Sequence, residues 1–153
     1  MLNAAAAHGL PLAIAEFPEG TRTAYDAAAA VGCSVDQIVK SMIFSADGEL
    51  VLALTSGANQ VAPEVLARLA GANRCGRADA DQVRATTGYA IGGVPPFGHH
   101  NPIRTWIDPH LLSYDQVWAA AGTPRHVFPI QPDELVKLTG AIPAIFTVVA
   151  PAS

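Results

Sequence analysis

Short apolar runs and helical patterns follow one another along the chain without a regular repeat. Strand-like runs occupy residues 11–17, 40–45, 49–55, 103–108, 125–130 and 144–149, and helical patterns occupy residues 4–7, 27–30, 63–71, 78–88 and 132–140. Strands and helices do not alternate as strict βαβ units, and several strand pairs look like hairpins. The pattern therefore predicts a mixed α/β fold and not a Rossmann fold.

Local start and stop signals bound several of these helices. Thr21 or Thr23 can cap a helix that ends at Gly32. Asp79 followed by Gln82 is a capping-box pattern, in which each side chain satisfies a free N–H group of the helix start. These signals predict helix boundaries without reference to the rest of the molecule.

The segment 34–44 supports two interpretations. Ser34 followed by Gln37 is another capping-box pattern, and the apolar residues after it fit one helical face. If this helix continues, Lys40 faces solvent; if a strand begins at Lys40, this lysine shares a face with apolar side chains. Taken alone, a solvated surface lysine is the more common outcome. Residues 113–122 are similarly ambiguous between helix and strand.

Asp47 and Gly48 separate two strand-like runs, which is a strong hairpin signal. No linker or change of composition divides the chain, so residues 1–153 are expected to form a single domain. We expect a central mixed, largely antiparallel sheet surrounded by helices.

Composition narrows the range of partners. The formal net charge is −4, and the two lysines and seven arginines are scattered. Nucleic-acid grooves need clustered cations, so binding to DNA or to duplexes in general is not expected, and any contact is small, such as a single-stranded end. No run reaches the ~18 apolar residues of a membrane span, and the first residues lack the features of a signal peptide, so we expect a cytoplasmic protein.

The segment Gly88–His100, GYAIGGVPPFGHH, places glycines beside two adjacent prolines. The prolines stiffen the backbone, whereas Gly92 and Gly93 leave room for a ligand. Free N–H groups at Gly93 and Val94 can hold a carbonyl, carboxylate or phosphate oxygen. A bulged strand end followed by a turn explains the same composition and is the more common structure.

The sequence contains no motif for a metal or a cofactor, and we expect neither. His99 and His100 are adjacent, so on a strand their side chains point to opposite faces. The chain has no HExxH, CxxC, GxSxG, P-loop or GxGxxG pattern. Cys33 and Cys75 are expected to be small buried hydrophobes, and a disulfide between them has little support. A metal-dependent hydrolase built on the two adjacent histidines is the weakest functional hypothesis.

Three parts of the sequence together resemble one known family. They are QIVKSMIF, TTGYAIGGVPPFGH, and WAAAGTPRHVF followed by PDELVKLTGA. They look like the YbaK/EbsC family of aminoacyl-tRNA deacylases, which are related to the editing insertion of bacterial prolyl-tRNA synthetases. The resemblance runs from about Leu10 to Ala144. It implies a YbaK-type domain, with a central mixed sheet or a partly closed barrel, and hydrolysis of the ester that joins a wrong amino acid to a tRNA.

The resemblance also implies roles for individual residues. Lys40 matches the family lysine, which would anchor the acceptor end or the aminoacyl group. Gly92 through Pro96, including Gly93 and Val94, match the family's Gly-x-x-x-Pro motif, whose backbone would hold the aminoacyl moiety. In the proposed family mechanism the terminal ribose hydroxyl activates water or acts itself, so positioning matters more than a protein base. The pocket walls map onto Thr23, Ser41, Ala121 and His126.

This sequence departs from the cysteine-specific relatives around the implied pocket. Thr23 replaces an aromatic residue, Ala121 replaces a serine, and Phe128 replaces an acid. Ser41 stands where cysteine-specific members have threonine and alanine-specific members have asparagine. The sequence IPAIF also replaces a Val-Ala-Asp pattern that many relatives carry after the last helix. These changes are compatible with a deacylase, but they do not indicate which amino acid it removes from the tRNA.

The implied substrate is the CCA end of a mischarged tRNA, tRNA-Pro or a related tRNA carrying a small wrong amino acid. A synthetase or elongation factor is the implied protein partner. The alternative is a non-catalytic module that uses the same pocket to bind an aminoacyl end or to regulate a partner. Turnover distinguishes the two, because a binding module releases no free amino acid.

Overall fold

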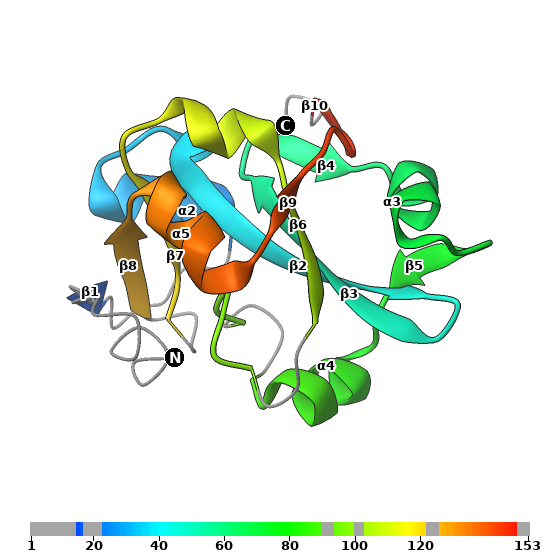
Figure 1. The fold of residues 1–153 in the computed structure, drawn as a ribbon. Helices are drawn as coiled ribbons and strands as arrows, with labels where there is room; N and C mark the ends of the chain where they lie inside the picture. The colour runs from blue at the N-terminus through cyan, green and yellow to red at the C-terminus, as the bar shows by residue number, and fades with distance from the viewer. Residues whose placement is uncertain (1–14, 17–22, 90–93, 100–102, 122–125, 150–153) are drawn as a thin grey trace.

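The computed structural model describes residues 15–16, 23–89, 94–99, 103–121 and 126–149 of the chain. A mixed sheet with the strand order β1-β8-β7-β2-β3-β6-β9 crosses the molecule, and β5 pairs with β2 beside this path (Figure 1). Its strands are β1 (Ala15–Glu16), β2 (Ile38–Ala46), β3 (Glu49–Ser56), β5 (Cys75–Arg77), β6 (Arg104–Ile107), β7 (Val117–Ala120), β8 (His126–Ile130) and β9 (Ile142–Pro143). A separate antiparallel pair joins β4 (Asn59–Val61) to β10 (Thr147–Val149).

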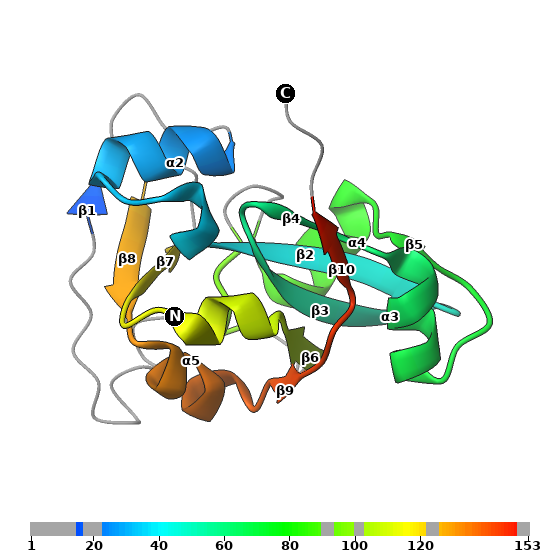
Figure 2. The ribbon, with the colours of Figure 1, turned by 90° about the horizontal axis from the view of Figure 1, so that it is seen from above.

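The helices lie around this sheet. They are α2 (Ala24–Val31), α3 (Pro63–Ala70), α4 (Ala80–Thr87) and α5 (Pro132–Thr139), with 3-10 turns at η1 (Val35–Gln37) and η2 (Pro109–Ser113). Helix α2 lies near β1 and β7 at one end of the sheet, and α3 lies near β5 at the other (Figures 1 and 2). None of the helices in the described ranges is both long and apolar enough to cross a bilayer.

The predicted mixed α/β fold is confirmed. Strand β2 is antiparallel to β3 and β5, and β8 is antiparallel to β7 and β1. Parallel pairs join β2 to β7, β3 to β6 and β6 to β9. The sheet is therefore mixed, with hairpins at β2–β3 and β7–β8.

The predicted boundaries of helices α2 and α4 are confirmed. Thr23, and not Thr21, caps α2, because its hydroxyl accepts a hydrogen bond of 3.1 Å from the N–H of Asp26. Gly32 ends the same helix at φ 76°, a conformation that costs glycine little. The capping box of Asp79 and Gln82 at the start of α4 is also present.

The β2–β3 hairpin turns at Asp47 and Gly48, as predicted. Both residues have positive φ, which suits a two-residue turn between twisted strands. The Asp47 carboxylate accepts hydrogen bonds from the N–H groups of Asn73 and Arg74, so it also fixes the chain that enters β5.

The helical interpretation of segment 34–44 was wrong beyond its first turn. The capping box of Ser34 and Gln37 forms, but the helix is the single 3-10 turn η1, and β2 begins at Ile38. Ile38 and Val39 pair with β7 on one edge, and Val39 pairs with β3 on the other. This strand pairing, which is a tertiary effect, outweighs the local helical pattern.

Several strands differ from the sequence prediction. The ambiguous segment 113–122 contains strand β7, in which Val117 and Ala119 are buried and Trp118 and Ala120 are partly exposed. Of the predicted final strand 144–149, only β10 (Thr147–Val149) forms a strand. Strands β4, β5 and β9 were not predicted, because each has two or three residues and no apolar run of its own. The predicted helix at residues 4–7 lies outside the described residues.

Two hydrophobic clusters cover the two faces of the central strands. One contains Val39, Ile43 and Leu54 together with Val94 and Phe97 from the proline-containing loop. The other contains Phe44, Val51, Ala53, Leu66, Trp106 and Phe146. Since successive side chains of a strand point to opposite faces, Val39 and Ile43 of β2 face the first cluster, whereas Met42, Phe44 and Ala46 face the second.

Candidate functional site

Lys40 is a partly buried lysine in the middle of the sheet. It lies on β2 opposite Thr55 of β3, on the same face as Met42. Its Nζ donates a hydrogen bond of 2.6 Å to the main-chain carbonyl of Asn59. Desolvation is the main effect that lowers the Lys40 pKa; the charge of Arg77 also lowers it, and the charge of Asp108 opposes the shift. The solvated surface lysine favoured from the residue alone was therefore wrong.

Ser41 follows Lys40 and points to the other face of the sheet. Its Oγ is buried, and among the described residues it is the one buried side-chain polar atom without a hydrogen-bond partner. Leaving a buried hydroxyl unpaired costs about 1–3 kcal/mol. Buried polar groups are nearly always paired, so an exception of this kind is a candidate ligand contact.

Strand pairing is interrupted beside these two residues. Along one edge of β2, β7 pairs with Ile38 and Val39, and β5 pairs with residues 44–46. Between them, the N–H of Ala78 bonds to the carbonyl of Ile43. Residues 40–42 therefore have no strand neighbour on this edge within the described part of the chain.

The proline-containing loop approaches the face that Ser41 shares with Val39. Val94, Pro95, Pro96 and Phe97 are buried. Phe97 packs edge-to-face against Phe128, with ring centroids 5.8 Å apart. Because the Val94 side chain belongs to the core, any ligand contact of Val94 must come from its main chain. Gly92 and Gly93 lie outside the described residues.

His99 fixes the end of this loop. Its Nε2 lies 2.6 Å from the carbonyl oxygen of Pro95. Burial lowers the His99 pKa, and the hydrogen bond to Pro95 partly opposes the shift. The ring therefore stiffens the loop in its neutral form. His100, its predicted neighbour on the opposite face, lies outside the described residues.

The remaining predicted wall residues lie at the start of α2 and in the β7–β8 hairpin. Thr23 is engaged as the cap of α2. Ala121 follows β7, and its N–H donates to the carbonyl of His126 at the start of β8, 2.8 Å away. Ala121 and His126 are thus brought together, and the segment between them lies outside the described residues. The roles of these three residues stay predictions.

Asp108 was not predicted as a site residue, although it connects to Lys40. Its side chain is 2% exposed. Its carboxylate accepts hydrogen bonds from the N–H of Ser56 at 3.2 Å, the Asn59 side-chain amide at 2.8 Å and the N–H of His110 at 3.0 Å. From sequence, Asp108 before a proline indicates an ordinary turn cap. No local signal reveals a partner 49 residues away.

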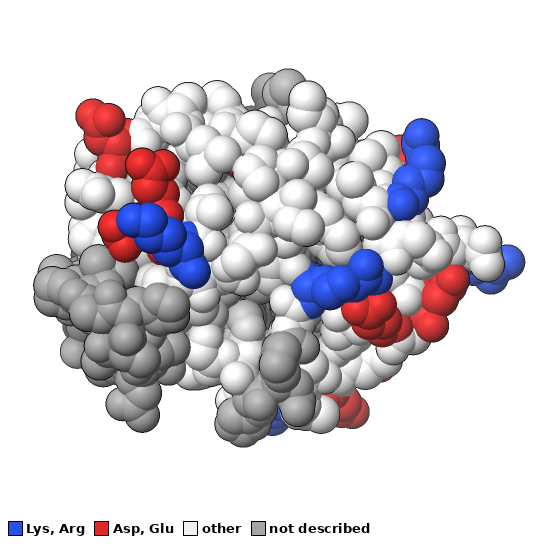
Figure 3. Space-filling model, in the orientation of Figure 1, with Lys and Arg blue, Asp and Glu red and all other residues white. Residues whose placement is uncertain are grey.

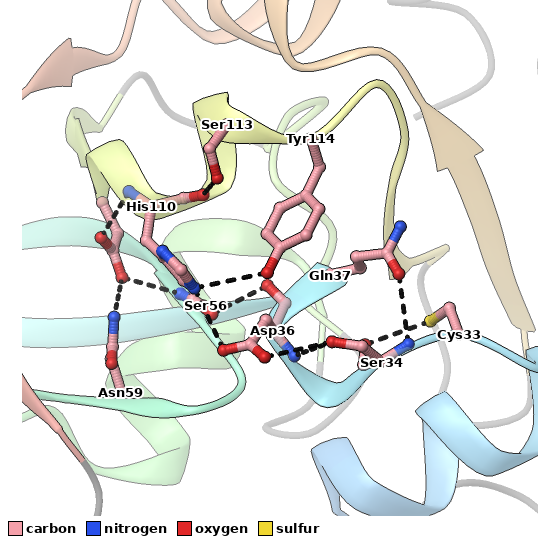
Figure 4. A network of polar contacts seen from close by, with 10 residues as sticks. Cys33, Ser34, Asp36, Gln37, Ser56, Asn59, His110, Ser113 and Tyr114 are labelled. Carbon is pink, nitrogen blue, oxygen red and sulfur yellow. Dashed lines mark hydrogen bonds and ion pairs between the residues drawn. The ribbon is translucent and has the colours of Figure 1, made fainter.

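A second polar cluster adjoins this one. His110 Nε2 lies 3.1 Å from a carboxylate oxygen of Asp36, and the same carboxylate accepts from the hydroxyl of Ser34 (Figure 4). The hydroxyl of Ser56 donates to the main-chain carbonyl of Asp36. The cluster joins η1, η2 and the end of β3, so it stabilises the start of β2.

The described residues contain no group of three potential ligands that could hold a metal ion. Cys33 and Cys75 are free and partly buried, where buried hydrophobes were expected. Burial is the main effect that raises the pKa of both thiols, which disfavours the reactive thiolate. On the face shown in Figure 3, Lys and Arg side chains are isolated and interspersed with Asp and Glu, without a broad basic patch.

Comparison with known proteins places the chain among translation-related proteins. The family model for the aminoacyl-tRNA editing domain matches residues 18–138. The proline–tRNA ligase of Nitratidesulfovibrio vulgaris (strain DP4) is 38% identical over 100 residues, which are 65% of this chain and 17% of the ligase. The chain therefore spans a small part of the length of this relative. The uncharacterized protein YwhH of Bacillus subtilis (strain 168) is 26% identical over 126 residues, covering 82% of this chain and 80% of YwhH.

Solved structures agree with the sequence relatives. A crystal structure of a proposed trans-editing enzyme for prolyl-tRNA synthetase is 45% identical, with a TM-score of 0.87 over 93% of this chain and 90% of the other. The hypothetical protein APE2540 is 31% identical, with a TM-score of 0.88 over 96% of this chain and 98% of the other. The resemblance and the fold type predicted from the sequence are thereby confirmed.

Proposed function

Because this chain belongs to the aminoacyl-tRNA editing domain family, we propose that it is a trans-editing deacylase. It hydrolyses the ester between a small wrong amino acid and the terminal adenosine of a tRNA. The similarity to proline–tRNA ligases and to a proposed trans-editing enzyme for prolyl-tRNA synthetase supports tRNA-Pro as the tRNA and a synthetase as the partner. Residues 1–153 act as one editing domain in this proposal.

The observation that carries the proposal is the pair Lys40 and Ser41 at the interruption of strand pairing. The partly desolvated Lys40 ammonium attracts an anionic phosphate or a polarised ester oxygen more strongly than it would in water. The buried Ser41 hydroxyl, which lacks a partner, supplies a hydrogen bond for the bound amino acid. A charged group and a hydroxyl on opposite sides of one strand edge suit a substrate that carries both a phosphate and an aminoacyl group.

The reaction depends on positioning. The terminal ribose hydroxyl of the substrate orients a water molecule, whose oxygen attacks the ester carbonyl carbon. The bond from that carbon to the ribose oxygen breaks, a proton passes to the ribose oxygen, and the amino acid leaves. Main-chain N–H groups at Gly93 and Val94 hold the carbonyl oxygen, while Gly92 and Pro96 shape the backbone around it.

The side chains around the aminoacyl group determine which amino acid is accepted. Thr23, Ala121 and His126 form the walls of the pocket in this proposal, together with Ser41. The small Ala121 and the short hydroxyl side chains favour a compact amino acid over a bulky one.

A deacylation screen tests this function. Purified protein is incubated with tRNA-Pro charged with Cys, Ala, Ser or Thr, and free amino acid is measured over time. Because the chain has two lysines, Lys137→Ala is a matched control for Lys40→Ala. We expect about a 100-fold or greater loss of kcat/KM for Lys40→Ala, since a misplaced substrate loses that much, and no loss for the exposed Lys137.

The same screen decides against the proposal in two ways. If the Lys40→Ala variant is fully active, Lys40 does not have the role proposed for it. A wild-type protein that retains charged tRNA and releases no free amino acid is instead the non-catalytic binding module.

A further inference from the structure

We propose that Asp108 is a positioning residue that acts through Asn59 to hold the Lys40 ammonium at its place beside the interrupted edge of β2. The inference deepens the proposed deacylase function and rests on it. Asp108 contacts Asn59, which accepts the hydrogen bond of Lys40, and in this proposal it does not contact the substrate.

Hydrogen bonds to neighbouring strands and turns fix the position of Asp108. It directly follows β6, which pairs in parallel with β3, and its N–H donates to the carbonyl of Leu54 at 2.9 Å. Burying a carboxylate is costly unless its oxygens receive hydrogen bonds. The donors of Ser56, Asn59 and His110 meet this need, which fixes the carboxylate in one orientation.

The carboxylate in turn clamps the turn between β3 and β4 at both of its ends. One oxygen accepts from the Ser56 main chain and from the Asn59 side chain, three residues further on. The main-chain carbonyl of Asn59 then accepts from Lys40 Nζ at 2.6 Å. Asn59 therefore links the buried carboxylate to the ammonium, through its side chain on one side and its backbone on the other.

The charges around Lys40 make this link measurable. Arg77 on β5 and Asp108 behind the turn are the charged groups that act on the Lys40 pKa, in opposite directions. Removing the negative charge of Asp108 leaves burial and Arg77 unopposed, so the Lys40 pKa should fall below its wild-type value. Because the loss of this charge alone moves the Lys40 pKa, the positioning role is decided by Asn59→Ala, which keeps the charge of Asp108 and removes its link to Asn59.

The test is a pH titration of the lysine side chains by NMR. In protein labelled with 13C-lysine, the Cε groups of Lys40 and Lys137 give two signals, so the exposed Lys137 is an internal reference. For Asp108→Asn we expect the Lys40 signal to titrate at lower pH than in the wild type and the Lys137 signal to be unchanged. We also expect kcat/KM for deacylation to fall about 10- to 100-fold, since small misplacements have effects of this size.

Two further variants separate positioning from stability. Asn59→Ala keeps the buried carboxylate and removes the link, so it should shift the Lys40 Cε resonance and lower kcat/KM even if Asp108→Asn does not fold. Asp47→Asn is the matched control, because Asp47 also accepts two main-chain N–H bonds but lies at the far end of β2. It should leave the Lys40 signal unchanged.

The outcomes are distinguishable from those of the proposed function. If Asn59→Ala leaves the Lys40 Cε resonance and kcat/KM at wild-type values, the positioning role is wrong, whatever the titration in Asp108→Asn. A comparable shift in Asp47→Asn would also overturn it. If no mischarged tRNA is hydrolysed, the deacylase proposal fails, while the NMR titration still decides whether Asp108 controls the ammonium.

Discussion

Lys40 and Ser41 are consecutive residues of β2 whose side chains lie on opposite faces of the sheet. Lys40 shares its face with Met42 and the Phe146 cluster, and Ser41 shares its face with Val94 and the Phe97 cluster. A flat, fully paired sheet would keep the two groups apart. Within the described part of the chain, β7 and β5 leave the edge of β2 without a strand neighbour at these residues, and the proposed function uses this gap as the place where one substrate contacts both groups.

Removing the Ser41 hydroxyl should not destabilise the protein. Since the buried Oγ has no partner, Ser41→Ala removes a desolvation penalty, and we expect the free energy of unfolding to stay equal or to rise by about 1 kcal/mol. Urea denaturation monitored by circular dichroism measures this. The same variant should alter the relative kcat/KM values of different aminoacyl-tRNA substrates.

Ser56→Ala is the matched control for this substitution. Ser56 is also a buried serine of the central strands, but its hydroxyl donates to the carbonyl of Asp36 at 2.8 Å. Its removal should lower the free energy of unfolding by about 1–2 kcal/mol. Equal destabilisation by both variants would mean that Ser41 has a partner in the folded protein.

Deacylation should decline at a lower pH than an ordinary lysine would allow. Burial lowers the Lys40 pKa from the usual 10.5, so the ammonium is lost earlier as pH rises. After subtraction of spontaneous ester hydrolysis, the alkaline limb of kcat/KM should therefore fall below pH 10.5. An alkaline limb that is unchanged in Lys40→Arg, whose side chain stays charged, would argue against Lys40 as its source.

The same pKa shift has a defined effect on stability. Because the folded protein releases the Lys40 proton at a lower pH than the unfolded chain does, the unfolded chain binds more protons between the two pKa values. The free energy of unfolding thus carries a penalty below the folded pKa, and this penalty disappears as pH rises toward 10.5. Urea denaturation across this range should show the rise in the wild type and a smaller one in Lys40→Ala.

Thr23 allows its structural and functional roles to be separated. Thr23→Ala removes the cap of α2 and should lower the free energy of unfolding by about 1 kcal/mol, whereas Thr23→Ser keeps the capping hydroxyl. Thermal denaturation measures this difference. If Thr23 also forms a pocket wall, both variants should change the preference among mischarged tRNAs at a temperature where each is folded. If the preference among mischarged tRNAs is unchanged, Thr23 caps α2 but does not form a wall of the pocket.

Elements with local causes were predictable from the sequence. The cap of Thr23, the capping box of Asp79 and Gln82, and the turn at Asp47 and Gly48 each depend on residues within four positions of one another. The mixed α/β class followed from the order of these elements. The family followed from three motifs, because their order and spacing are specific.

Features that depend on distant pairing were not predictable. The helical pattern after Ser34 gave way to strand pairing with β3 and β7, and the short strands β4, β5 and β9 exist only through their partners. The site roles of Gly92 and Gly93 stay predictions, since both lie outside the described residues.

The residues alone determined where helices α2 and α4 begin and end and where the β2–β3 hairpin turns, because these features depend on neighbouring positions. The residues also indicated the family, through short motifs in a specific order. The tertiary structure decided that Lys40 is partly desolvated, that Ser41 keeps a buried hydroxyl without a partner, and that Asp108 reaches the lysine through Asn59. Those properties arise from contacts between residues tens of positions apart, and a linear pattern carries no information on which of these groups the sheet brings together.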